Sequence, residues 1–375
     1  MRIRIHHLTS ALGILLCIAQ APAAAAPYTF QLLPSPEWQG TVGSAATSIN
    51  DKGDVAGTLQ NSAGLNFNTG VVWKADGTAF ASMGLRGANG INNSGTVVGD
   101  TLWMPGTGAG RPAIYTPSTG NTLLDFSGIN GRANAVNDKG QITGFDVDAS
   151  SRAPHAVRWD NGVKTDLGTL GGSSSLGYAI NADGIVVGNA RISGCCVNHA
   201  VMWLADGSVV DLGLLIPSSS DSTAYGMNDR GDAVGTAANE WGGNTQAVVW
   251  RQGKGSILAP LVANAVSVAY DVNNKGQIVG LSGHATLWEN DQAIDLNSLL
   301  PKSFLDDGWI LDSATGINDD GSIVGTASNQ RLGRQSAFLM KATAAEVPEP
   351  ASIALVVAGL LGVGAHRRRT SGVRR

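Results

Sequence analysis

Apolar and polar positions follow a unit that returns about every 45 residues along most of the chain. In each copy an apolar residue precedes an Asn, two residues follow that are polar except for Ala182, and a Gly, a short β-prone run and a second Gly complete the pattern. The Asn positions are 42, 45, 44, 47, 45 and 45 residues apart. They are Asn50, Asn92, Asn137, Asn181, Asn228, Asn273 and Asn318. Such a constant period indicates a repeat architecture.

The two glycines keep the same register in all seven copies. The first lies three residues after the Asn, as Gly53, Gly95, Gly140, Gly184, Gly231, Gly276 and Gly321. The second lies seven residues after it, as Gly57, Gly99, Gly144, Gly188, Gly235, Gly280 and Gly325. Because β-prone runs flank the Asn-x-x-Gly segment, each copy is expected to begin with a hairpin in which the first Gly supplies a positive φ.

The rest of each copy predicts two more strands. In the fourth copy these are the apolar run 199–203, a turn at Asp206-Gly207, and a second run that ends in residues 211–213, Asp-Leu-Gly. Four antiparallel strands in about 45 residues match a propeller blade, and no helical periodicity of 3.6 is present. The chain is therefore predicted to be an all-β, seven-bladed β-propeller of four-stranded antiparallel blades.

The ends of the array predict how the ring closes. The seventh copy stops after its third strand, residues 336–341, while the run from Tyr28 to Leu33 precedes the first copy in the place of a fourth strand. We expect this N-terminal strand to pair with the last blade, which would leave no open sheet edge at the seam.

One position of the third strand is aromatic in every copy: Trp73, Tyr115, Trp159, Trp203, Trp250, Trp288 and Phe338. These side chains are predicted to form core between neighbouring blades rather than a ligand-stacking row. His155, His199 and His284 share another position of this strand, where other copies have Gln246 or Ser336. A His that Gln or Ser can replace is expected to be a hydrogen-bonding strand residue, not a catalytic or metal-binding one.

The two ends of the chain are predicted to be targeting segments. Residues 1–25 carry two Arg, an apolar run and a small-x-small cleavage site, the pattern of a secretory signal peptide. Residues 26–341 form the repeat body, 342–350 a linker with a Pro-Glu-Pro motif, and 351–375 an apolar segment with an Arg-rich end. The fifteen apolar residues 351–365 would rise about 22 Å as a helix, short of the roughly 30 Å hydrocarbon core.

The C-terminal motif resembles the PEP-CTERM sorting signal of Gram-negative bacteria. The residues that carry the resemblance are Val347, Pro348, Glu349 and Pro350, followed by the apolar run and then Arg367, Arg368 and Arg369. The resemblance implies recognition by an exosortase-type sorting protease, cleavage near Pro348–Pro350, and transfer to the cell surface or an extracellular matrix. Before processing, the apolar run would hold the chain in the inner membrane, with the arginines on the cytoplasmic side. The alternative is an ordinary single-pass tail anchor.

The repeat body resembles the HAF-type extracellular repeats over residues 28–341. The matching motifs are residues 155–159 (HAVRW), 166–172 (DLGTLGG) and 180–188 (INADGIVVG). The resemblance implies an exported protein and brings no established chemistry to named residues.

Charge excludes one class of partner. Two of the 25 Lys and Arg residues lie in 1–25 and five lie in 351–375, so the body holds 18 against 29 Asp and Glu and has a formal charge near −11. Such an acidic body is a poor partner for phosphate backbones, so no nucleic acid is expected. Cys195 and Cys196 are adjacent and poorly placed for an ordinary disulfide. Their role stays open, and no metal or cofactor is predicted, since structural metal sites need four ligands.

The sequence indicates where the protein is exported more clearly than it indicates any biochemical activity. No HExxH, P-loop, Gly-x-Ser-x-Gly elbow or EF-hand loop is present in the sequence. We favour a non-enzymatic protein of the cell surface or matrix that binds a polysaccharide or another exported protein. The alternatives are an extracellular carbohydrate-active hydrolase or lyase and a structural matrix protein without a specific ligand. Residues outside the repeat pattern are the candidate ligand loops: Glu240, Trp241, Asp306, Asp307 and Trp309.

Overall fold

The computed structural model describes residues 28–35, 41–61, 68–81, 84–102, 110–194, 196–215, 219–239 and 245–343. One compact unit spans Tyr28–Ala342. It contains strands β1 to β28, with one 3-10 turn, η1 (Leu296–Leu299), and one short helix, α1 (Lys302–Asp306). The predicted all-β class is confirmed. Among the described residues, no helix has the length and apolar character needed to cross a membrane; the predicted signal and sorting segments lie outside those residues.

Three sheets have four antiparallel strands each, paired in chain order. The first holds β6 (Gly87–Ile91), β7 (Val97–Leu102), β8 (Gly110–Thr116) and β9 (Gly120–Leu123). The second holds β10 (Asn130–Val136), β11 (Ile142–Val147), β12 (Pro154–Asp160) and β13 (Val163–Asp166). The third holds β22 (Ser267–Val272), β23 (Ile278–Ser282), β24 (His284–Glu289) and β25 (Gln292–Asp295).

Two further sheets have eight strands, and each consists of two four-stranded halves joined by one parallel bridge. One joins β14 (Gly171–Ile180), β15 (Val186–Ile192), β16 (Asn198–Trp203) and β17 (Val209–Gly213) to β18 (Ser219–Met227), β19 (Ala233–Asn239), β20 (Gln246–Arg251) and β21 (Lys254–Ile257). The other joins β26 (Trp309–Ile317), β27 (Ile323–Asn329), β28 (Arg334–Ala342) and β1 (Tyr28–Leu32) to β2 (Thr41–Ile49), β3 (Val55–Asn61), β4 (Thr69–Trp73) and β5 (Ala79–Ala81).

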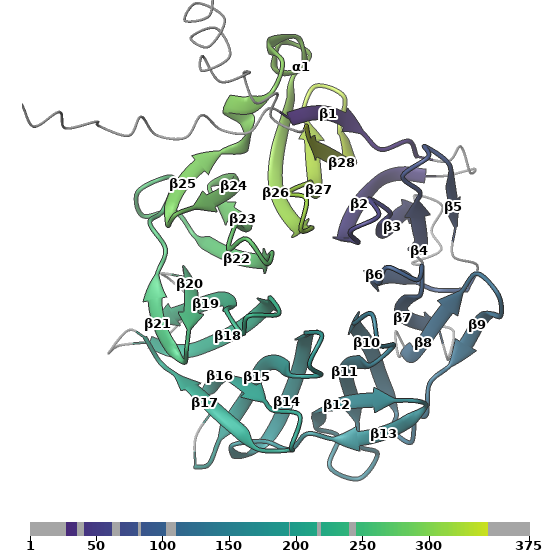
Figure 1. The fold of residues 1–375 in the computed structure, drawn as a ribbon, viewed down its shortest axis with the longest axis vertical. Coiled ribbons are helices and arrows are strands. Elements are labelled where there is room, and N and C mark those ends of the chain that lie inside the picture. The colour runs from purple at the N-terminus through teal and green to yellow at the C-terminus, as the bar shows by residue number, and fades with distance from the viewer. Residues whose placement is uncertain are drawn as a thin grey trace, which may run out of the picture. The chain divides into compact units, whose positions relative to one another are not determined.

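The sheets stand side by side around a central opening (Figure 1). The first strand of each four-stranded group lies nearest the centre; we call these strands, β2, β6, β10, β14, β18, β22 and β26, the inner strands. Each inner strand contacts the next, and β26 contacts β2, so the contacts run around a complete circle.

The predicted closure of the chain is confirmed. Strand β1 pairs antiparallel with β28, from Tyr28 opposite Ala342 to Leu32 opposite Phe338. The ring of Phe30 lies 4.4 Å from the ring of Phe304 and 6.1 Å from that of Phe338 (centroid distances). The N-terminal strand therefore completes the last sheet both through its backbone and through its aromatic side chain.

Every inner strand carries a β-bulge at the same place. The ladder to the second strand skips the residue three positions before the repeat Asn, which we call the bulge position. The skipped residues are Thr47, Asn89, Asn134, Tyr178, Tyr225, Tyr270 and Thr315. A bulge leaves one residue unpaired and re-aims its side chain.

The bulge explains the second Gly of the repeat. That Gly pairs with the residue just before the bulge, as Gly235 does with Ala224. In every copy a Cβ at this Gly would overlap the carbonyl oxygen of the residue five positions before the repeat Asn, such as that of Thr223. The first Gly has a positive φ in every copy, for example 81° at Gly231, as the hairpin prediction requires. The first Gly is therefore required for its backbone conformation, and the second for the close approach of the inner strand.

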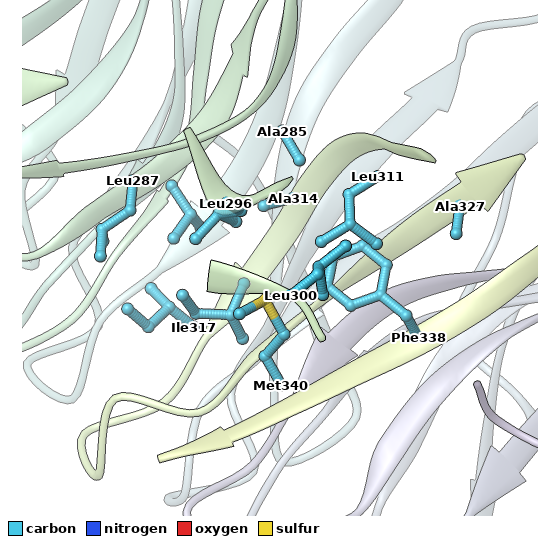
Figure 2. Packing of buried hydrophobic residues seen from close by; sticks show 12 residues of the cluster. Ala285, Leu287, Leu296, Leu300, Leu311, Ala314, Ile317, Ala327, Phe338 and Met340 are labelled. Carbon is cyan, nitrogen blue, oxygen red and sulfur yellow. The ribbon is translucent and has the colours of Figure 1, made fainter. Parts of the chain in front are cut away.

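Buried clusters lie between neighbouring sheets. Figure 2 shows Leu311, Ile317 and Met340 from the last sheet packing with Leu287 of β24 and Leu296 of η1. The repeated aromatic is buried in six copies, with an exposed fraction of 2% or less at each. These six are Trp73, Trp159, Trp203, Trp250, Trp288 and Phe338. The prediction that these six side chains form core is confirmed.

Candidate functional site

The repeat Asn joins neighbouring inner strands at one end of the ring. In Asn273, Oδ1 accepts hydrogen bonds from the backbone N–H of Lys275 (3.1 Å) and Gln277 (3.0 Å), which closes the hairpin turn. Its Nδ2 donates to the carbonyl oxygen of Asn318 in the next copy (3.0 Å). The same bond between copies forms in six of the seven steps, at 2.8 to 3.1 Å. The Asn is therefore a structural residue that links the sheets.

The residues after these Asn side chains form an acidic rim. The rim consists of Asp51, Asn93, Asp138, Ala182, Asp229, Asn274 and Asp319, and it surrounds a central pocket of about 220 Å³. Asn93 Nδ2 donates to Asp51 (2.9 Å) and Asp138 (2.7 Å), and Asn274 Nδ2 donates to Asp229 (3.0 Å) and Asp319 (2.8 Å). In the described part of the chain no three His, Cys, Asp or Glu side chains are grouped to hold a metal ion. The rim carboxylates accept hydrogen bonds from neighbouring copies.

The residue at the bulge position is polar in four neighbouring copies and aromatic in the other three. Four polar residues there donate to a carbonyl of the next inner strand: Thr47 to Ala88 (2.5 Å), Asn89 to Ala133 (2.8 Å), Asn134 to Gly177 (2.7 Å) and Thr315 to Ala46 (2.9 Å). The other three copies have tyrosines on the consecutive inner strands β14, β18 and β22. We call Tyr178, Tyr225 and Tyr270 the tyrosine arc.

The rings of the tyrosine arc touch one another across three four-stranded groups. Tyr225 lies 5.2 Å from Tyr178, edge to face, and 6.1 Å from Tyr270 (centroid distances). All three are half-buried, and they lie on inner strands, which stand nearest the centre of the ring (Figure 1). Burial raises the pKa of Tyr178 to about 12 and also raises the pKa of Tyr270, in both cases with a smaller contribution from Tyr225.

The hydroxyls of the tyrosine arc are neutral donors and acceptors. None of the three bonds to another described residue, and none is among the buried polar atoms that lack a partner, so all reach solvent. A row of rings with free polar tips combines apolar contact with hydrogen bonding. The arrangement suits a ligand that has both apolar faces and hydroxyl groups.

Asp271 departs from the repeat pattern beside the arc. The other copies place only Gly, Ala or Ser at this point, two residues before the repeat Asn. Its two carboxylate oxygens accept hydrogen bonds from the backbone N–H of Val272 (2.9 Å) and Ile317 (3.0 Å). Burial raises the pKa of Asp271 to about 6; the two hydrogen bonds oppose this shift and Asp319 adds to it.

This pKa predicts a pH-dependent stability. Because the folded pKa is above the ordinary value of 3.8, the folded state keeps its proton where the unfolded chain has lost it. The contribution of Asp271 is fully present below pH 4 and is lost as pH rises through 6, a change of about 3 kcal/mol. Denaturant unfolding from pH 4 to 7 should show this fall in the native protein and a flatter profile in Asp271→Asn. Parallel profiles would contradict it.

The residues singled out from the sequence lie elsewhere. Asp306 ends α1 and pairs with Lys302 at 2.7 Å, with both side chains exposed. Asp307 follows it, and Trp309 begins β26 with its ring stacked on Phe304 at 5.8 Å, against the core of the last sheet. Glu240 and Trp241 lie outside the described residues, as do the sorting residues 347–350 and 367–369. The structure therefore places Trp309 in packing contacts, and it does not bring Asp306 to the tyrosine arc.

Two of the three histidines of the third strand, His155 and His199, form side-chain hydrogen bonds as the sequence predicts. Nδ1 of His155 lies 2.8 Å from Asp166, and Nδ1 of His199 lies 2.9 Å from Asp211. Each Asp also accepts from the N–H of the Gly two residues later, at 2.8 Å. The His and the Asp-Leu-Gly motif thus tie the third strand to the fourth. Cys196 is a free, exposed cysteine, and Cys195 is outside the described residues.

Sequence reasoning missed the tyrosine arc, although a signal for it was present. Aligning the copies on the repeat Asn puts Tyr178, Tyr225 and Tyr270 in one column, where the other copies have Thr or Asn. That column carries most of the chain's tyrosines, three of five. A change from polar to aromatic across three consecutive copies marks this position as specialised.

Solved structures share the fold of this chain. The β-propeller domain of the Trilobed protease from Pyrococcus furiosus has a TM-score of 0.51 at 10% identity, covering 82% of this chain and 100% of that domain. It is described with an open velcro topology, whereas β1 pairs with β28 here. An oligogalacturonate lyase in complex with manganese has a TM-score of 0.48 at 12% identity, covering 84% and 97%. A gluconolactonase from Xanthomonas campestris has a TM-score of 0.39 at 14% identity, covering 67% and 83%.

At these identities the likeness concerns the fold alone, which is all-β and propeller-like. No curated protein matches the sequence. The C-terminal residues 346–369 match the model of the PEP-CTERM protein-sorting motif. This chain therefore carries the PEP-CTERM signal, which exosortase-type systems recognise and which implies export to the cell envelope or surface of Gram-negative bacteria.

Proposed function

We propose that the protein is an exported, non-enzymatic seven-bladed propeller that binds an extracellular polysaccharide through the tyrosine arc. Each four-stranded sheet, and each half of an eight-stranded sheet, is one blade; six are built from one HAF-type repeat each, and the last combines three strands of the seventh repeat with β1. The body is released from the membrane when an exosortase cleaves near residues 348–350. Residues 1–25 are removed as a signal peptide, and the mature protein remains at the surface or in the matrix.

The observation that carries the proposed ligand class is the tyrosine arc. Three neighbouring rings present apolar faces, and their hydroxyls have no partner among the described residues. Sugars combine apolar C–H faces with hydroxyl groups, so this wall offers both of the contacts they need. Another exported protein is the second ligand class. The arc favours the polysaccharide because its three rings form a narrow row on inner strands, not a broad outer patch.

A single ring at the centre of the arc tests this function. Tyr225→Ala removes the ring that contacts both neighbours, and we expect it to weaken polysaccharide binding by about tenfold or more. Tyr225→Phe keeps the stacking and loses only the hydroxyl, so its loss should be smaller. The full chain, purified after export, is screened on a glycan array and each hit is measured by calorimetry.

The control variant is Tyr28→Ala, which removes a half-buried tyrosine from β1, an outer strand. It should leave glycan affinity unchanged. If no glycan binds to the native protein, or if Tyr225→Ala binds as the native protein does, glycan binding at the arc is wrong. In the first case the structural matrix protein without a ligand becomes the better account.

A second candidate function is an extracellular carbohydrate-active hydrolase or lyase. Asp271 supports it, because a carboxyl with a pKa of about 6 can give or take a proton near neutral pH, and Asp319 lies close enough to raise that pKa. Glycosidic cleavage uses a pair of such carboxyls. New chain ends released from a bound polysaccharide, and lost in Asp271→Asn, would favour the enzyme. Polymer recovered intact favours binding alone.

A further inference from the structure

One basic residue lies on the inner strands, next to the tyrosine arc. Arg132 of β10 is the only Lys or Arg in the sequences of the inner strands, all of which the structure describes. It lies two residues before the bulge position of β10, and β10 neighbours β14, which carries Tyr178. Its side chain is 47% exposed.

The guanidinium of Arg132 is held on one side and open on the other. Nη2 donates to Oδ1 of Asn89 at 2.5 Å, and Nε lies 3.6 Å from Oδ1 of Asp100. Nη1 makes no hydrogen bond to any described residue. Two contacts therefore fix the plane of the group while at least one N–H edge stays free for a ligand.

Asp100 lies near two arginines, Arg132 and Arg86. The carboxylate is buried, with 3% of its side chain exposed, and Nη2 of Arg86 lies 2.6 Å from its Oδ2. Arg86 is thus the close partner, and Arg132 is the second cation on a single carboxylate. Burial raises the pKa of Asp100, while Arg86 and then Arg132 oppose that shift. The three side chains line a side pocket of about 290 Å³ together with Thr58, Asn68 and Gly87.

The charge also reaches the arc itself. Strand β10 contacts β14, which carries Tyr178, and the charge of Arg132 lowers the pKa of the Tyr178 hydroxyl against the larger effect of burial. The acidic rim lies at the other end of the same strands, beyond the repeat Asn. Along the inner surface the charge therefore changes from negative at the rim to positive beside Tyr178.

We infer that Arg132 selects, at the end of the tyrosine arc, sugars that carry a carboxylate, an inference that rests on the glycan binding proposed above. The planar guanidinium matches a carboxylate, and a pre-oriented fork loses little freedom when it binds. The tyrosines contact the sugar ring, and Arg132 binds its carboxylate. Because the body is acidic overall, an acidic glycan gains affinity only at such a local cation.

The test compares one ligand in two charge states. The exported full chain is titrated with a galacturonic acid oligomer and with the same oligomer as its methyl ester, which keeps the ring and removes the charge. We expect the acid oligomer to bind about tenfold more tightly than its ester, as one charge-assisted contact would give. Added salt should reduce this ratio of affinities. Arg132→Gln should lower the acid to the affinity of the ester and leave the ester unchanged.

Controls separate this selectivity from folding and from overall charge. Arg251→Gln removes an arginine that pairs with Asp291 in another sheet, and it should keep the native ratio. Melting temperatures are measured for each variant, and Arg132→Met, which keeps the apolar stem, replaces the Gln variant if that one does not fold. Equal binding of acid and ester by the native protein, or an unchanged ratio without Arg132, would overturn the selectivity but leave glycan binding standing. No binding of either oligomer, together with an empty glycan array, overturns both.

Discussion

Gly235→Ala is expected to prevent stable folding. The added Cβ would overlap the carbonyl oxygen of Thr223 and lie 2.9 Å from the Cα of Ala224, both backbone atoms that cannot turn aside. To accept it, β18 and β19 must separate at the bulge, which breaks ladder bonds and the packing behind them. We expect a loss of about 4 kcal/mol or more, measured as a collapse in melting temperature or in yield of folded protein.

Gly231→Ala is the matched control within the same repeat. Its φ is 81°, and no atom lies within 4 Å of the added Cβ, so only the backbone conformation is penalised. We expect a loss of about 1 kcal/mol and a protein that still folds. Similar losses at both positions would show that close approach of the strands is not the reason for the second Gly.

Deleting residues 28–33 is expected to open the ring. The deletion removes the whole of β1, including Phe30, and leaves β28 without the partner it has from Phe338 to Ala342. Lost ladder bonds and lost aromatic packing together should cost about 4 kcal/mol or more. The exposed edge of β28 is then a template for another chain, so dimers or aggregates are expected in size-exclusion chromatography.

Two further measurements make this result specific. A synthetic peptide with the sequence of residues 28–33 should restore part of the melting temperature, because it can occupy the vacant edge. Thr29→Ala alters an exposed side chain of β1 whose hydroxyl makes only a 3.4 Å bond to Lys341, and it should change stability by about 0.5 kcal/mol or less. A deletion variant that melts like the native protein would mean that β28 does not need its partner.

Much of the fold could be predicted because the repeat uses short-range rules. The turn from Asn273 to Gly276 closes within its own residues, and its pattern is visible wherever it recurs. The aromatic at Trp288 and its counterparts in five other copies are buried for the same reason, since the alternation of a strand sends them to one face, whereas Tyr115 of the second copy is half-buried. The closing strand was also predictable, because counting strands per copy leaves one missing at the end and one spare at the start.

The candidate site could not be predicted from these short-range rules. Trp309 stood out as a deviation from the repeat, yet in the structure its ring packs on Phe304, because α1 folds back beside β26. Tyr225 kept the repeat register and so attracted no notice. Its importance depends on the bulge that leaves it unpaired in the ladder and on the neighbouring copies that carry tyrosines at the same place.

The sequence by itself determined the class of fold, the period of the repeat, the partner of the first strand and the export signal, since each follows from a local pattern or a count. Only the tertiary structure decided which side chains meet at the centre. Tyr178 and Arg132 lie 46 residues apart in the chain and become neighbours because consecutive inner strands stand side by side around one axis. Contacts between repeats depend on that curvature and on the bulges, and neither leaves a mark in the hydrophobic pattern of a single copy.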